Sequence, residues 1–351
     1  MQNRIATLLR FGLFQGPTPP PYSHEEWTGM VEYALPQGVA PLLYHCVALL
    51  PKEARPPKAI LFRLASIASD NERQQRRLQA ALIRFSDMAY SQLGLETLVV
   101  KGVAIGRYYP TPYLRESGDN DICFGNEAHR IDAWVASTGI EVDTSDDRHS
   151  VFAFEGATFE NHLHLLYHAA GEASSARIDP RWNTQRLYDH ITTLVPHELA
   201  FFVAAHMDHH ATYHNEPIRM RDLVDWALLI ARSPMDYTAL NRYKETYDIC
   251  RFIDLLTQYT IKTFNIPAPE GFTPLSERAL AHFATLYLAP RKRNSHTVVR
   301  VLSRSWQYLR YNTTYKEIYG QSMFSRFYIH NVLFALKQWI KGQERHQGRK
   351  R

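Results

Sequence analysis

The sequence predicts an α+β fold in which a small sheet, mixed or antiparallel, is flanked by helical regions on both sides. Apolar residues recur at helical spacing in residues 1–94 and again in residues 180–340. Between them, residues 95–179 contain short apolar runs separated by turn residues, a pattern typical of strands. We therefore expect a helical N-terminal region, an α/β core and a helical C-terminal domain, followed by a basic tail over residues 341–351.

The N-terminal region is predicted to be helical with two breaks at its prolines. The first break is the proline-rich stretch 17–21, after which Ser23 is placed to cap a helix. The second break spans residues 51–57. From Ala59 to Leu93 apolar residues recur at helical spacing over one long segment, and the glycine that follows, Gly94, favours a helix end there.

Five stretches of the central region are predicted to be strands, with a short helix between the second and the third. Short turns separate the last three strands, and such connections predict antiparallel pairing. The strands are Leu95–Val100, the run from Asp119, Ile140–Asp143, Val151–Phe154 and Thr158–Leu166, and the helix is Glu127–Ser137.

Beyond residue 180 the sequence predicts helices again. Prolines separate the helical segments, and one of them, Pro196, suits the first turn of a helix. The expected helices are Pro196–Met207, Ile218–Ala231, Tyr237–Phe264, Leu275–Leu288 and Phe324–Trp339.

The composition is that of an ordinary globular protein. Of the 351 residues, 45% are hydrophobic and 21% are charged, and the chain is long enough for two or three cores. A net charge of +5 suits an anionic ligand such as a nucleotide, without indicating nucleic acid as the partner. Three widely separated cysteines predict no disulfide framework and favour the cytoplasm. We expect no signal peptide and no membrane span.

The clearest chemical signal is Asp119-Asn120-Asp121, at the start of the second predicted strand. Alternate strand residues share a face, so Asp119 and Asp121 project together. Two adjacent carboxylates repel each other unless a cation lies between them, and hard divalent cations prefer such oxygen ligands. The preceding strand ends in Lys101-Gly102, where glycine lets the backbone approach a phosphate and Lys101 and Arg115 add positive charge. The pattern indicates a metal-dependent site for a phosphorylated ligand.

This layout resembles a bacterial family of uncharacterised nucleotidyltransferases within the superfamily that includes DNA polymerase β. Val100-Lys101-Gly102, Arg115 and Asp119-Asn120-Asp121 match that family's Leu-Lys-Gly strand end, arginine and Asp-x-Asp in order and spacing. The wider superfamily has Gly-Ser or Gly-Gly in place of Lys101-Gly102. The resemblance covers residues of about 95–230.

The resemblance implies a transferase with a polymerase β-like core that moves a nucleoside monophosphate from a nucleoside triphosphate to an acceptor hydroxyl and releases pyrophosphate. The cofactor would be Mg²⁺ or Mn²⁺. The acceptor and the base of the nucleotide are not indicated. The alternative is a non-catalytic nucleotide-binding or regulatory protein with a decayed site. The implied metal and catalytic residues are Asp119, Asp121 and Glu160, and the implied phosphate-binding residues are Lys101, Gly102, Arg115, Ser117 and Arg221.

The third acid of such sites lies on a strand beside the Asp-x-Asp strand. The segment Thr158–His164 alternates, so that Glu160, His162 and His164 share one face. Glu160 is our candidate, either as a metal ligand or as the base that deprotonates the acceptor hydroxyl. Alternatively, His162 occupies the acid's position and the metal site is depleted.

The helical region offers two further groups. Arg221 and Asp225 lie four residues apart, and the resembled family carries a similar Arg-x-x-x-Asp helix. Arg221 either reaches the triphosphate, oriented by Asp225, or the two form a plain ion pair on the helix surface. His206, His210 and His214 line one helix face. Because no further ligand is indicated, we expect polar helix residues near the cleft there rather than a zinc site.

Overall fold

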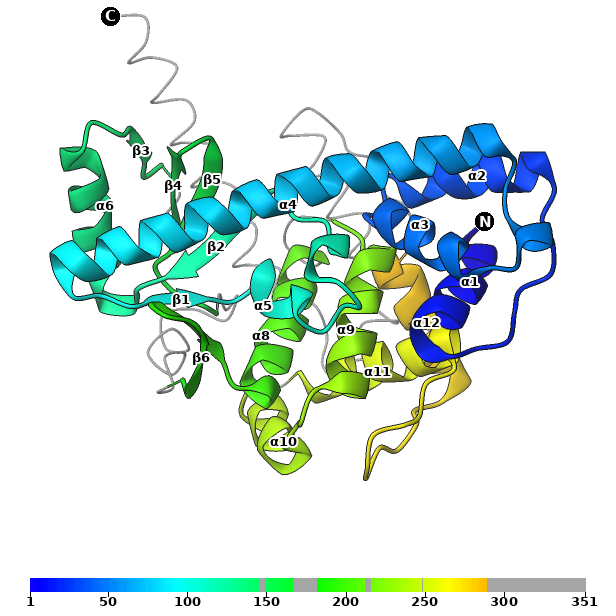
Figure 1. Cartoon of the computed structure of the whole chain (residues 1–351). Coiled ribbons are helices and arrows are strands. Elements are labelled where there is room, and N and C mark those ends of the chain that lie inside the picture. Colours follow the sequence, from blue (N-terminus) through cyan, green and yellow to red (C-terminus); the bar gives the residue numbers. More distant parts are fainter. Residues whose placement is uncertain (146–148, 167–181, 212–215, 248, 289–351) are drawn as a thin grey trace, which may run out of the picture.

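The computed structural model describes residues 1–145, 149–166, 182–211, 216–247 and 249–288 (Figure 1). Within these residues the predicted α+β class is confirmed, because one mixed sheet lies among helices that precede and follow it. The long helix α4 (Lys58–Leu93) runs along the molecule, with the sheet beside one half and the other N-terminal helices beside the other. The expected helix Phe324–Trp339 and the basic tail lie outside the described residues.

The N-terminal helices begin and end where local sequence chemistry predicts. Ser23 caps α2, because its side-chain oxygen accepts a hydrogen bond from the Glu26 amide at 3.2 Å and its own amide donates to the Glu26 carboxylate at 2.8 Å. Helix α4 ends at Gly94, which has a φ of 71°. The helices before α4 are α1 (Gln2–Phe14), α2 (His24–Ala34) and α3 (Ala40–Leu49).

The sheet has seven strands in the order β3-β4-β5-β2-β1-β7-β6 among the described residues. The pairs β3–β4 and β4–β5 are antiparallel, as the short turns predict. In contrast, β2 lies parallel to β5 and antiparallel to β1, which makes the sheet mixed. The strands are β1 (Thr97–Val99), β2 (Asp119–Cys123), β3 (Val142–Asp143), β4 (His149–Phe154), β5 (Ala157–His162), β6 (Thr184–Tyr188) and β7 (Ile191–Leu194).

Two strands lie where we expected helix to resume after residue 180. Strands β6 and β7 form an antiparallel hairpin, and β7 pairs in parallel with β1. Tertiary contacts explain these strands. One edge of β1 pairs with β2, and the backbone groups of its other edge form hydrogen bonds with β7. The β-branched run Ile191-Thr192-Thr193 of β7 suits an extended backbone. The sheet therefore extends beyond the segment in which we expected all of its strands.

The two faces of the sheet pack against different helices. On one face, Ile122 of β2 and Phe159 of β5 pack with Phe85 of α4 and with Ile131 of α6 (Ala128–Ser137). On the other face, Cys123 belongs to the core that contains α8 (Pro196–His209). Since β2 alternates between these faces, its two aspartates lie on the α8 side.

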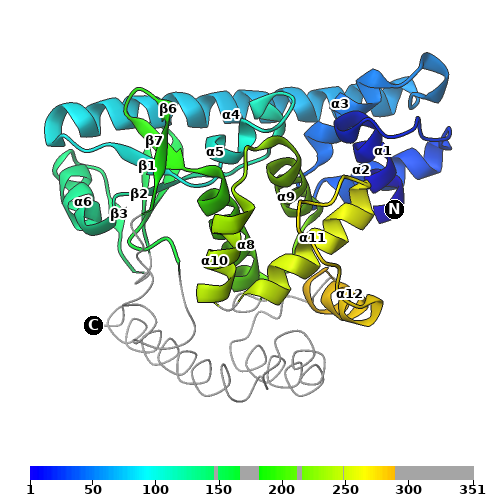
Figure 2. The same cartoon turned by 90° about the horizontal axis from the view of Figure 1, so that it is seen from below.

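The remaining helices form the C-terminal part of the described chain (Figure 2). The segment in which we expected a single helix, Tyr237–Phe264, is divided into two helices around Tyr247. None of the helices within the described ranges is both long and apolar enough to cross a membrane. These helices are α9 (Met220–Arg232), α10 (Tyr237–Thr246), α11 (Cys250–Phe264) and α12 (Glu277–Phe283), and a single turn, α5 (Val103–Gly106), follows β1.

Candidate active site

Strands β2 and β5 place their acidic residues side by side. The parallel register sets Asp121 opposite Glu160 and Asp119 opposite Thr158. Asn120 lies on the other face, where its amide donates to the backbone oxygen of Leu78 at 3.1 Å. The predicted common face of Asp119 and Asp121 follows from this alternation.

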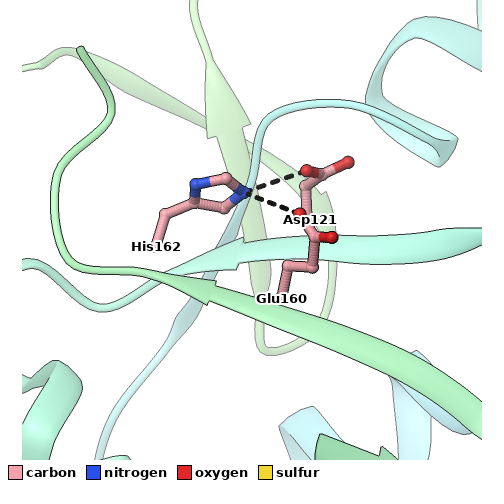
Figure 3. Close-up of side chains that lie close together, drawn as sticks. All are labelled: Asp121, Glu160 and His162. Carbon is pink, nitrogen blue, oxygen red and sulfur yellow. Dashed lines mark hydrogen bonds and ion pairs between the residues drawn. The ribbon is translucent and has the colours of Figure 1, made fainter. Parts of the chain in front are cut away.

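Asp121, Glu160 and His162 form a compact cluster (Figure 3). The Nε2 atom of His162 lies 2.9 Å from Oδ1 of Asp121 and 3.8 Å from Oε2 of Glu160. The side chains of Asp121 and His162 are only 3% and 6% exposed, whereas that of Glu160 is 29% exposed. The structure thus brings together both residues that the sequence offered for the third position.

Lys101 contributes the nearest positive charge. Its Nζ atom lies 2.5 Å from Oδ1 of Asp121, and its side chain is 19% exposed. Burial by itself would raise the pKa of the Asp121 carboxyl, but the Lys101 ammonium and the contact with His162 outweigh burial and hold that pKa well below its usual range. At neutral pH the Asp121 carboxyl is therefore ionised and paired with Lys101 and His162.

The other two carboxyls of the site shift in the opposite direction. Burial raises the pKa of Asp119, and the negative charge of Asp121 adds to that effect. Burial also raises the pKa of Glu160, and the charges of Asp121 and Asp119 raise it further. A divalent cation would relieve this repulsion, because it favours the charged form of all three groups.

The donor atoms fit a divalent cation. Asp121, Glu160 and His162 each offer one ligand atom, and these atoms lie within 4.8 Å of one another. Carboxylate oxygens suit Mg²⁺ and Mn²⁺, and an imidazole nitrogen suits softer metals. Asp119 is not part of this group of three, although its side chain lies on the same face of β2.

The loop after β1 lies against the strand that carries the aspartates. Gly102 has a φ of 50°, a conformation that favours glycine, and a Cβ there would lie 3.9 Å from both the Asp119 oxygen and Ser117 Oγ. Ser117 donates a hydrogen bond to the Asp119 backbone oxygen at 3.2 Å. Lys101, Gly102 and Ser117 therefore surround the beginning of β2.

Arg115 is bound to a helix of the C-terminal part. Its guanidinium donates two hydrogen bonds to Asp225, from Nε at 2.9 Å and from Nη2 at 2.8 Å. The Tyr109 hydroxyl donates to the same carboxylate at 2.6 Å, and all three side chains are buried. Burial by itself would lower the pKa of Arg115, but Asp225 outweighs burial and raises it, and burial together with Asp225 raises the pKa of Tyr109. Phosphate binding by Arg115 stays a prediction.

The prediction of a plain surface ion pair between Arg221 and Asp225 is wrong. Asp225 is 2% exposed and binds Arg115, because the helix turns this carboxylate inward. Arg221 instead donates to the Glu116 backbone oxygen at 3.0 Å and lies 3.2 Å from Asp222. Its positive charge is among those that act against the rise in the pKa of Asp119. Arg221 therefore lies close enough to Asp119 for its charge to act on that carboxyl, and phosphate binding by Arg221 stays a prediction.

Helix α8 brings a histidine toward the same site. Burial and, next, the charge of Lys101 lower the pKa of His206 well below its usual range, and His162 contributes as well. His206 also stacks on His210 with ring centroids 4.1 Å apart. His214 lies outside the described residues. The proximity of His206 agrees with the expectation of polar helix residues near the site.

Sequence reasoning missed Tyr109 and the partner of Arg115. Tyr109 and Asp225 are separated by 116 positions, and Arg115 and Asp225 by 110. No local spacing signals such a contact. One local sign indicated that Asp225 is buried: it lies between Val224 and Trp226, on the apolar side of α9.

Parallel strands that carry a buried acidic cluster, beside a Lys-Gly strand end, define a site suited to metal-dependent transfer of phosphorus groups. A family model described as uncharacterised nucleotidyltransferase matches residues 23–265, and the chain belongs to that family. No curated protein and no solved structure matches the chain. The match contains β2, β5, the loop after β1 and helix α9, and so every residue of the site described above.

Proposed function

We propose that this protein transfers a nucleoside monophosphate from a nucleoside triphosphate to an acceptor hydroxyl and releases pyrophosphate. The observation that carries the proposal is the parallel register of β2 and β5, which sets Asp121 beside Glu160 next to Lys101. Family membership supports it. The mixed sheet and the Asp-x-Asp strand also support a place within the polymerase β-like superfamily. The three widely separated cysteines suit the cytoplasm.

Asp119, Asp121 and Glu160 would hold Mg²⁺ or Mn²⁺. When bound, the cation supplies positive charge that neutralises the phosphate oxygens. His162 would keep Asp121 in place, because its Nε2 lies 2.9 Å from the carboxylate. The side chains are thus arranged before the substrate arrives, which favours catalysis by positioning.

Lys101, Gly102, Ser117 and Arg221 would bind the phosphates. Lys101 presents an ammonium group at the start of β2, and Gly102 gives the loop beside it a positive φ that favours glycine. Arg221 lies near enough to Asp119 to affect its pKa. Arg115 would act through its pair with Asp225, which fixes α9, and therefore Arg221, against the core.

Glu160 is proposed as the base that accepts the proton of the acceptor hydroxyl. The parallel register of β2 and β5 sets it opposite Asp121. It is also the most exposed member of the cluster, at 29%, so an acceptor can reach it.

A second candidate is a nucleotide-binding protein without catalytic activity. One observation favours it: Lys101 and His162 both contact Oδ1 of Asp121, so this carboxylate is satisfied without a cation. Metal dependence separates the two candidates.

Isothermal titration of ATP, GTP, CTP and UTP tests the proposal, with and without Mg²⁺. We expect at least one nucleotide to bind in a Mg²⁺-dependent manner, and Asp121→Asn to abolish that dependence. The matched control is Asp87→Asn, an exposed aspartate on α4, which should bind as the wild type does. Binding that is equal with and without Mg²⁺ would favour the second candidate, and absence of binding by all four nucleotides would overturn both.

A further inference from the structure

The turn between α2 and α3 is bonded to the first residues of helix α9. Gln37, in this turn, accepts two hydrogen bonds: the Met220 amide donates to its side-chain oxygen at 2.9 Å, and the Arg221 amide donates to its backbone oxygen at 3.1 Å. The first amides of a helix have no partner within that helix, so Gln37 satisfies two of them. The N-terminal helical region therefore fixes the start of α9, although Gln37 and Met220 are 183 positions apart in the sequence.

The next residue of the turn, Gly38, lies against the side chain of Arg221. A Cβ atom at Gly38 would lie 3.3 Å from both Cβ and Cδ of Arg221, which is tighter than an ordinary van der Waals contact. The φ of Gly38 is 66°, in the left-handed region that favours glycine. Glycine therefore lets the turn touch the aliphatic part of Arg221, and a larger residue would push that side chain away.

The guanidinium end of Arg221 is held beside the candidate site. Its Nη1 atom donates to the backbone oxygen of Glu116 at 3.0 Å, and its Nη2 atom lies 3.2 Å from Oδ1 of Asp222. Glu116 directly precedes Ser117, whose hydroxyl donates to the Asp119 backbone oxygen. Arg221 is thus held at its amide, along its aliphatic part and at its guanidinium.

These contacts leave part of the guanidinium for a ligand. Each of the two terminal nitrogens carries two N–H groups, and the contacts of Arg221 with Glu116 and Asp222 use one on each. The side chain is 17% exposed, so it is held in place without being closed off from solvent. Guanidinium groups with N–H groups to spare suit the oxygens of a phosphate.

Holding this side chain in advance favours binding. A long side chain loses conformational entropy when it is ordered. If the protein orders Arg221 before the phosphates arrive, binding does not incur that cost. The contacts of Gln37 and Gly38 with Arg221 order it in this way.

We propose that the Gln37-Gly38 turn positions Arg221 to bind the phosphates of the substrate, so that the N-terminal helical region takes part in the substrate site. This rests on the proposed function, in which Arg221 binds phosphate. Both residues of the turn act through Arg221. Gln37 acts on the backbone at the start of α9, and Gly38 acts on the aliphatic part of the side chain.

Calorimetric titration with inorganic triphosphate in the presence of Mg²⁺, and then with each nucleotide that binds, tests the proposal. Gln37→Met keeps the length of the side chain and removes the amide oxygen. It should weaken triphosphate binding about two- to tenfold, the worth of one hydrogen bond. Gly38→Ala, which presses on Arg221, should weaken it by a similar factor. Leu35→Ala, at an exposed position of the same turn, is the matched control and should bind as the wild type does.

A double-mutant cycle separates positioning from a merely structural contact. In an Arg221→Ala background, Gln37→Met should cause no further loss of triphosphate affinity, because the side chain that it positions is absent. A merely structural contact would lower the melting temperature and leave the affinity of the folded protein unchanged. Unchanged affinity of a folded Gln37→Met protein, or an equal loss with and without Arg221, would overturn the proposal. Gln37→Met strains no backbone, so it decides the question even where Gly38→Ala does not fold.

Comparison of the two kinds of ligand separates this inference from the proposed function. If inorganic triphosphate shows the expected cycle and none of ATP, GTP, CTP and UTP binds, the turn positions Arg221 and the assignment to nucleotides is wrong. If nucleotides bind in a Mg²⁺-dependent manner and their affinity does not depend on Gln37, the proposed function stands and this inference is wrong. Absence of binding by all of these ligands would overturn both.

Discussion

The two aspartates of β2 should respond to neutralisation in opposite ways. Asp121 is 3% exposed and lies 2.5 Å from Lys101. At an effective dielectric constant of 20 their attraction is about 7 kcal/mol, which the desolvation of both groups partly offsets. Loss of one partner from a buried pair costs about 3–5 kcal/mol, and we expect Asp121→Asn to lower the free energy of unfolding by that amount.

Asp119→Asn should leave the free energy of unfolding unchanged or raise it. The pKa of Asp119 is raised by burial and by Asp121, so the folded protein binds this proton more tightly than the unfolded chain does. The charged form therefore destabilises the fold above the folded pKa. The gain from Asp119→Asn is present at neutral pH and disappears as the pH falls and the wild-type carboxyl takes up its proton.

Urea denaturation at pH 7.5 and at pH 4, without added metal, measures both effects. The depressed pKa of Asp121 means that its contribution is present above the unfolded pKa, about 4, and is lost as the pH falls through the folded pKa. Asp87→Asn is the control on an exposed position. Equal losses for Asp119→Asn and Asp121→Asn at pH 7.5 would refute the reasoning, because the two carboxyls would then share one environment.

Three further outcomes are expected. Asp225→Asn leaves the Arg115 guanidinium buried without its counter-charge and should cost about 3–5 kcal/mol in urea denaturation; a change below about 1 kcal/mol would contradict the pair. Arg221→Ala should weaken triphosphate binding about tenfold in calorimetry with an unchanged melting temperature, whereas Arg219→Ala, on the exposed side of the same helix end, should not. Burial raises the pKa of the Cys46 thiol to about 12, so the free energy of unfolding should fall as the pH rises from about 8.5 toward 12. Native Cys46 should also resist iodoacetamide at pH 8, and rapid alkylation there would refute its burial.

Features that depend on neighbouring residues in the sequence could be predicted. Ser23 and Gly94 act on backbone groups within a few positions, so helix α2 begins and α4 ends where expected. The alternation of β2 likewise places Asp119 and Asp121 on one face. Each of these depends on dihedral preferences or on the period of a strand, and both are properties of the local chain.

Features that depend on contacts between distant segments could not be predicted. Alternation places Glu160 on a face of its strand, and the family resemblance implied its place near Asp121, but no local pattern predicts the parallel pairing of β5 with β2 that sets the two side by side. Strand β7 exists as the partner of β1, and its β-branched run is too short to predict a strand without that partner. The pair of Arg115 with Asp225 spans 110 positions and involves a helix that no local pattern connects to the core.

Lys101 connects the two parts of the proposed site. Its ammonium group lies 2.5 Å from the same Asp121 oxygen that His162 contacts. Without a bound metal or nucleotide, Lys101 therefore compensates the negative charge of this buried carboxylate. A cation held by Asp121 would repel that ammonium group, and the phosphates of a bound nucleotide would offer it new partners. Lys101 would then exchange a carboxylate for a phosphate as the nucleotide binds. The metal and the nucleotide would each favour movement of Lys101 away from Asp121. Binding of either one should therefore strengthen binding of the other.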